Sequence, residues 1–166
     1  MNEHLLSIFI EESPKIQIKS MQEDNLIVGS FAGKINKDTL NSFSNFSINC
    51  EILGRAYKGR GFSCGFAEVE DIKAYCNLTS PNKDKALMVY IECNTTAGFN
   101  GDAICKGKSK ILQGYGNLAG IIGFGNVEMP LAKTLSLDEI SLPMKMSLKI
   151  KYPLSLKKTS SLYKIH

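Results

Sequence analysis

Five cysteines carry the most varied chemistry in this 166-residue chain, because a thiolate can act as a nucleophile, a metal ligand or half of a disulfide. They are Cys50, Cys64, Cys76, Cys93 and Cys105. No two of them form a Cys-x-x-Cys pair, and the only histidines, His4 and His166, stand at the ends of the chain. The pattern therefore predicts no metal site. It also leaves a cysteine or serine nucleophile without a base in the core.

The spacing of two cysteines predicts a disulfide, because opposed residues of an antiparallel hairpin lie equally far from the turn. Cys93 and Cys105 are centred on Phe99, next to the turn dipeptide Asn100-Gly101. Opposed Cα atoms lie about 4.5–5.5 Å apart, which a disulfide accepts. We expect Cys93 to pair with Cys105.

The same rule leaves two choices for Cys64. Cys64 and Cys76 are centred on Glu70, and Cys50 and Cys64 are centred on Tyr57; both centres fall in predicted turns. We expect Cys64 to pair with either Cys50 or Cys76. The alternative for all five cysteines is that they are small buried apolar residues in a reducing compartment.

Acidic side chains do not indicate a paired-carboxylate mechanism. Most stand at predicted turns or at outward strand positions, where solvated carboxylates are the norm. The acids considered are Glu68, Glu70, Asp71, Glu92, Asp102 and Glu128. We predict neither a catalytic set nor a cofactor.

Glycines dominate residues 108–129, KSKILQGYGNLAGIIGFGNVEM. A helix there would lose ~1 kcal/mol at each glycine relative to alanine, so two strands joined by a reversal are expected. A dinucleotide-binding fingerprint would need its third glycine one residue earlier and a helix after it. We expect structural roles for Gly114, Gly116, Gly120 and Gly123, with Gly116 and Gly120 in conformations or contacts that only glycine tolerates.

This glycine stretch resembles a motif of allene oxide cyclases, dirigent proteins and related small bacterial proteins, in which a strand enters Gly-Thr/Ser-Gly-x-(aromatic or Leu)-x-Gly. The likeness rests on Cys105-Lys106-Gly107-Lys108, on Ile111 to Gly123, and upstream on Asn49-Cys50 and Gly61-Phe62-Ser63-Cys64. The chain departs from the motif at Tyr115, where the group has Thr or Ser. It also has Val69-Glu70-Asp71-Ile72 where bacterial members carry an Asp-x-Asp-Gly-Asp turn.

The resemblance implies an eight-stranded antiparallel barrel. It also implies chemistry on apolar molecules, since the plant enzymes of the group isomerise or guide oxylipin and phenolic intermediates. No catalytic residue of those enzymes can be carried onto this chain by motif.

Positive charge is concentrated toward the C-terminus. The chain has a net charge of +4, yet no acid follows Glu139 and six lysines do. Such a segment can bind anionic lipid or nucleic acid. However, Met144, Met146 and Leu148 alternate with lysine and serine, which is typical of a half-buried strand with lysines outward. Aromatic residues do not alternate with these lysines, so we predict no nucleic-acid partner.

Period-two alternation extends over most of the chain and predicts a single all-β domain over residues 1–166. Expected strands include 15–21, 25–35, 47–56, 61–69, 72–79, 86–94 and 102–112. This spacing favours a closed antiparallel β-barrel of about eight strands, with a β-sandwich as the alternative. We expect residues 1–14 and 153–166 to be peripheral. No apolar run is long enough to span a membrane, and we expect a soluble protein without a signal peptide at this N-terminus; the compartment stays open, with an extracytoplasmic location as the alternative if a signal was removed.

Three functions fit such a barrel. The first is binding of an apolar small molecule in the interior, with Phe62, Phe66, Phe124, Met144, Met146 and Leu148 as lining. The second is an isomerase or cyclase acting on a lipid-like substrate, which rests on the resemblance alone. It would be favoured by Asn49, Glu51, Tyr75 or Tyr90 pointing into a cavity. The third is a structural module that forms a homo-oligomer. A completely filled interior would count against the first.

Overall fold

The computed structural model describes residues 2–11, 15–57, 69–97, 103–130 and 144–153, and this part of the chain contains nine strands and no helix. The strands are β1 (Asn2–Ile10), β2 (Lys15–Ser20), β3 (Asp24–Asp38), β4 (Ser47–Tyr57), β5 (Val69–Thr79), β6 (Lys85–Ala97), β7 (Ala103–Gly116), β8 (Ile122–Pro130) and β9 (Met144–Lys151). In the described residues, no helix is long and apolar enough to cross a membrane.

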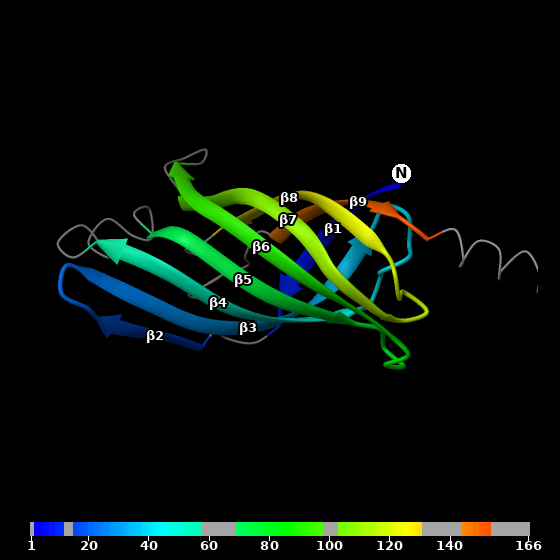
Figure 1. Ribbon diagram of the computed structural model, residues 1–166, viewed down its shortest axis with the longest axis horizontal. Coiled ribbons are helices and arrows are strands. Elements are labelled where there is room, and N and C mark those ends of the chain that lie inside the picture. Colours follow the sequence, from blue (N-terminus) through cyan, green and yellow to red (C-terminus); the bar gives the residue numbers. More distant parts are fainter. Residues whose placement is uncertain (1, 12–14, 58–68, 98–102, 131–143, 154–166) are drawn as a thin grey trace, which may run out of the picture.

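Eight of the strands close into an antiparallel ring, with β2 outside it (Figure 1). The ring runs β1-β9-β8-β7-β6-β5-β4-β3, and pairing of β1 with β3 closes it. β1 and β2 follow one another along one edge of β3, since β1 pairs with Gly33–Asp38 and β2 with Asn25–Ser30. The predicted barrel is confirmed. The expectation that residues 1–14 are peripheral is wrong for β1, which is part of the wall.

Alternating side chains build the core, as the period-two pattern predicts. On β9, Met144, Met146, Leu148 and Ile150 are buried, and the lysines between them are exposed. The loop after β3 covers one end of the barrel, where Phe43 and Phe46 are buried and their rings meet edge to face at 5.3 Å.

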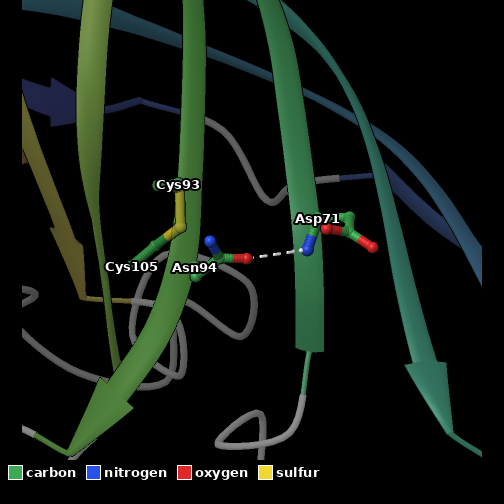
Figure 2. Close-up of a disulfide and its surroundings, with 4 residues drawn as sticks. All are labelled: Asp71, Cys93, Asn94 and Cys105. Atoms are coloured by element: carbon green, nitrogen blue, oxygen red, sulfur yellow. Dashed lines mark hydrogen bonds between the residues drawn. A yellow bond between two sulfur atoms is a disulfide. The ribbon is translucent and has the colours of Figure 1, made fainter.

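The expected turn at Glu70-Asp71 is wrong, because both residues belong to β5. The register between β4 and β5 shifts near Leu53 and Arg55, and Asp71 adopts φ of +52° there. Asparagine and aspartate tolerate this left-handed region better than most residues. The Asp71 N–H donates to Asn94 Oδ1 at 3.0 Å, which ties the irregular segment to β6 (Figure 2).

Two disulfides join neighbouring strands on the inner face of the barrel. Cys93 pairs with Cys105, as predicted, and their Cα atoms are 5.4 Å apart (Figure 2). The pair is diagonal rather than directly opposed, because Cys93 faces Gly107 and Cys105 faces Thr95.

The second disulfide differs from the prediction. Cys50 and Cys76 are directly opposed on β4 and β5, with their Cα atoms 4.1 Å apart, and they pair with each other. Neither is therefore available for the expected bond to Cys64, which lies outside the described residues.

The glycine-rich hairpin forms as predicted, with β7 ending at Gly116 and β8 beginning at Ile122. Gly116 has φ of +63° and Gly120 has φ of +82°, a region that disfavours residues with a Cβ. Gly114 and Gly123 are needed for close approach instead. A Cβ on Gly114 would collide with the Leu118 backbone, and one on Gly123 would lie 2.9 Å from the Lys149 carbonyl oxygen.

Candidate functional site

Close-packed core fills the interior where β5 and β6 meet. Cys76 and Leu78 on β5 and Leu87 and Val89 on β6 have no exposed surface. A side chain with no surface that water can reach borders no water-sized void. The interior around these four side chains is therefore filled, which is one of the two arrangements open to a barrel of eight strands.

The structure places the residues predicted to line an interior cavity at different positions. Met144, Met146 and Leu148 point inward, where they are at most 1 % exposed and belong to the packed core. Phe124 is 55 % exposed on the outer face of β8, so its predicted place inside is wrong. Phe62 and Phe66 lie outside the described residues.

The polar residues that would favour catalysis also point outward. Asn49 and Glu51 are exposed between buried neighbours on β4, and Tyr75 is 54 % exposed on β5. Tyr90 lies on the outer side of β6, between buried Val89 and Ile91.

One histidine–aspartate pair does lie inside, and the sequence pattern did not predict it. His4, which we expected at an extremity, is 1 % exposed on β1, and its Nδ1 lies 3.1 Å from Asp38 Oδ2. Asp38, 2 % exposed, also accepts the backbone N–H groups of Leu40 at 3.1 Å and Phe43 at 2.9 Å. The carboxylate therefore fixes the loop over the barrel end to β1.

A bulge in β3 places Asp38 inside. Ile8 faces Ile35 and Leu6 faces Asp38, so two residues of β1 span three of β3. Strict alternation from the buried Ile35 would point Asp38 outward, and the extra residue reverses that direction. The alternation of His4, Leu6 and Ile8 could have revealed the buried histidine. No pattern in the sequence marks the bulge.

The His4–Asp38 pair has the composition of a general base and its orienting acid, but it does not face open space. His4 Nε2 is buried without a hydrogen-bond partner among the described residues, and the Phe43 ring lies 4.9 Å from the imidazole ring. A base must come within hydrogen-bond reach of the proton it removes. Burial raises the pKa of nearby Tyr152, and the Asp38 charge adds to this rise while a hydrogen bond to Ser42 opposes it.

The outer face of β7, β8 and β9 gathers exposed lysines in strand register. Its rows are Lys106–Glu128–Lys145, Lys108–Asn126, Lys110–Phe124–Lys149 and Ile122–Lys151. Six exposed lysines thus share this surface with one acid, Glu128, whose Oε1 lies 3.9 Å from Lys106 Nζ. We call it the lysine face and define it by Lys106, Lys108, Lys110, Leu112, Ile122, Phe124, Asn126, Glu128, Lys145, Lys149 and Lys151.

Apolar side chains occupy the hairpin end of the lysine face. Leu112, Ile122 and Phe124 are 46 %, 57 % and 55 % exposed, and Phe124 stands between Lys110 and Lys149 in one row. On β8, Phe124 has the same parity as Asn126 and Glu128, and this could have shown that it points outward. The strand β9 has no aromatic residue among its lysines, but pairing with β8 places Phe124 beside Lys149.

Next to the lysine face, β1, β8 and β9 form a surface hollow of about 440 Å³. Its lining is mostly apolar and includes Leu5, Leu6, Val127 and Met146, and its polar members include Lys37, Lys145, Glu128, Ser7, Thr39 and Ser147. Gly125 and Asn126 make no regular pair with β9, and the Asn126 N–H donates to Ser147 Oγ at 2.9 Å instead. An apolar floor, two cations, one carboxylate and several small hydrogen-bonding groups therefore meet in one hollow.

Tyrosines continue the central row onto the next two strands. Lys110 faces Tyr90 on β6, and Tyr90 faces Tyr75 on β5, with the two rings 5.0 Å apart. Tyr90 donates its hydroxyl to Glu92 Oε1 at 2.6 Å, and this hydrogen bond, followed by burial and the Glu92 charge, raises the pKa of Tyr90 to about 12. Tyr90 is thus a neutral donor at physiological pH.

Comparison with known proteins does not assign this chain to a family. No family model matches it, and no curated protein or solved structure is similar to it. The resemblance to allene oxide cyclases and dirigent proteins stays a prediction.

Proposed function

We propose that this protein is a binding module, in which the disulfide-linked barrel is a rigid scaffold and the outer face makes the functional contact. The observation that carries this proposal is the packed interior. Cys76, Leu78, Leu87 and Val89 are fully buried, so no space for an apolar ligand borders these four side chains. Of the three functions considered from the sequence, the proposal is nearest to the third, the structural module. It places the functional contact on the outer face of the barrel and not in the interior.

Exposed apolar residues on the outer face give a second argument for the proposal. Monomeric proteins expose single apolar residues commonly, but contiguous apolar groups tend to mark interaction sites. Leu112, Ile122 and Phe124 form such a group, since Ile122 and Phe124 alternate along β8 and Lys110, two residues before Leu112, faces Phe124. Inside the barrel, by contrast, the polar side chains of His4 and Asp38 contact each other.

Methyl NMR titration with an apolar probe such as 1-aminoanthracene tests where ligands bind. We expect the methyl signals of Leu78, Leu87 and Val89 to stay unshifted, while those of the exposed Leu112 and Ile122 respond. Leu87→Ala is the matched control, because the void left by a truncated core leucine can admit a small apolar molecule. Saturable shifts at Leu78 and Val89 in the unmodified protein would contradict the proposal.

Native mass spectrometry gives an independent check. The purified protein should have the mass of the unliganded chain with two disulfides between the described cysteines. A retained apolar molecule that survives substitution of Ile122 and Phe124 by serine would instead support interior binding.

A further inference from the structure

We propose that the lysine face docks on the surface of a phospholipid membrane that contains anionic lipids. The inference rests on the proposed function, since it names the partner of the same outer face. No strand or helix needs to cross the bilayer in this arrangement.

Charge complementarity is the first argument. Six lysines on three adjacent strands face outward with one glutamate among them, and the flanking acids Glu3 and Glu92 stand at the margins, opposite Lys149 and Lys108. Each lysine near an anionic leaflet strengthens binding about five-fold. Lys37 and Lys145 line the neighbouring hollow with one acid, Glu128, which leaves it one net positive charge, and Ser7, Thr39 and Ser147 could donate hydrogen bonds there to a lipid phosphate.

The kind of apolar residue distinguishes a membrane from a nucleic acid. Proteins that bind single strands stack bases on aromatic rings. Within the lysine face, two of the three exposed apolar residues, Leu112 and Ile122, are aliphatic, and the tyrosines Tyr75 and Tyr90 lie beyond it on β5 and β6. Aliphatic side chains beside lysines match surfaces that lie at the boundary of headgroups and acyl chains. The two disulfides add support, because such bonds persist in oxidising compartments and outside cells.

The arrangement also gives an orientation. From Ile122 to Glu128 the outer side of β8 extends about 20 Å at ~3.3 Å per residue, so it can lie along a membrane surface. Leu112, Ile122 and Phe124 cluster at the hairpin end, whereas Lys106, Glu128 and Lys145 form the far row. We therefore expect the hairpin end to enter the lipid more deeply than the far row.

Vesicle co-sedimentation of the full oxidised chain tests the proposal. We expect binding to phosphatidylcholine vesicles that contain phosphatidylglycerol, and none to pure phosphatidylcholine. Raising the salt concentration from ~0.1 M to ~1 M should release the protein, since the screening length falls from about 10 Å to about 3 Å. Binding that is equal on both vesicle types, or insensitive to salt, would overturn the electrostatic part.

Paired substitutions locate the contact. Lys110→Gln with Lys149→Gln should weaken vesicle binding about 30-fold, from about five-fold per lysine. Lys15→Gln with Lys19→Gln removes the same charge from β2, which lies outside the ring on the other side of the molecule (Figure 1), and should change binding little. Equal losses in the two variants would mean that net charge alone drives binding, and would overturn the assignment to this face.

The apolar contribution has its own matched pair. Ile122 and Ile18 are 57 % and 51 % exposed, so Ile122→Ser and Ile18→Ser remove similar exposed surface from β8 and β2. Ile122→Ser should weaken binding about five-fold, and Ile18→Ser should not. Thermal melts of both variants check folding. Equal effects of the two substitutions would overturn the insertion of the hairpin end.

The same variants separate this inference from the proposed function. A single-stranded oligonucleotide that binds more tightly than the vesicles, with the loss confined to the β7–β9 variants, would overturn the lipid but keep the outer face as the binding site. Absence of binding to all anionic vesicles would also overturn the lipid. The proposed function itself would be removed by interior methyl shifts in the NMR titration, or by an apolar molecule that the Ile122 and Phe124 variants still retain in native mass spectrometry.

Discussion

The buried end of the barrel and the lysine face use charged side chains in opposite ways. Inside, Asp38 contacts His4 and accepts two backbone N–H groups, so its carboxylate holds the loop after β3 against β1. Outside, six lysines share one acid, and the ion pair between Lys106 Nζ and Glu128 Oε1 spans 3.9 Å. Exposed pairs of this kind contribute about 0–1 kcal/mol to folding. Burial thus separates charges that hold the protein together from charges that remain available to a partner.

Removing the inner carboxylate is the strongest way to test this comparison. Asp38→Ala leaves the His4 imidazole and two backbone N–H groups without their acceptor, and each buried group left unsatisfied costs about 1–3 kcal/mol. Urea denaturation should show this loss in the free energy of unfolding. The control, Glu51→Ala, removes an exposed carboxylate of β4 and should change it by less than about 0.5 kcal/mol. Equal effects would mean that the inner pair has no special structural role.

Opening a disulfide should have the next largest effect. Cys93 and Cys105 are 12 residues apart, and closing a loop of this size stabilises a protein by about 3 kcal/mol in the chain-entropy estimate. Cys93→Ala with Cys105→Ala should therefore lower the melting temperature. The Cys50–Cys76 bond closes a 26-residue separation, so opening it should cost slightly more. A melting temperature of the unmodified protein that does not respond to reductant would contradict both expectations.

The two hairpin glycines should differ, although the sequence treats them alike. Both have positive φ, which strains a residue with a Cβ by ~1–2 kcal/mol. A Cβ on Gly116 would also collide with the Asp84 carbonyl oxygen, whereas the nearest atom to one on Gly120 is Pro153 Cγ at 3.3 Å. Gly116→Val should cost about 2–3 kcal/mol and Gly120→Val about 1–2 kcal/mol. Thermal melts that leave both variants unchanged would show that the hairpin tolerates side chains.

The smallest expected effect lies on the outer surface, at Tyr90. Its raised pKa means that the folded protein keeps the phenolic proton where the unfolded chain has lost it. The associated stability is complete below pH ~10, the ordinary tyrosine value, and is lost as pH rises through about 12. Glu92→Gln should bring the Tyr90 pKa back toward 10, measured by ultraviolet absorbance of the phenolate. An unchanged titration would mean that the Glu92 hydrogen bond does not hold the proton.

Local patterns in the sequence determined the strand architecture. Alternation gave β9 its buried methionines and outward lysines, because successive side chains of any strand point to opposite faces. Gly116 and Gly120 predicted the hairpin, because the backbone has positive φ values there that residues with a Cβ disfavour. The Cys93–Cys105 bond was also predictable, because a short hairpin places its two strands side by side.

Only the tertiary structure decided the His4–Asp38 pair and the lysine face. The Cys50–Cys76 bond depends on the register of β4 against β5. The His4–Asp38 pair depends on the bulge in β3, because one extra residue reverses the direction of a side chain. Likewise, the row Lys110–Phe124–Lys149 joins residues from three strands, so no single segment contains it. Alternation says which side of a strand a residue occupies, whereas its neighbours across the sheet are fixed by pairing between distant parts of the chain.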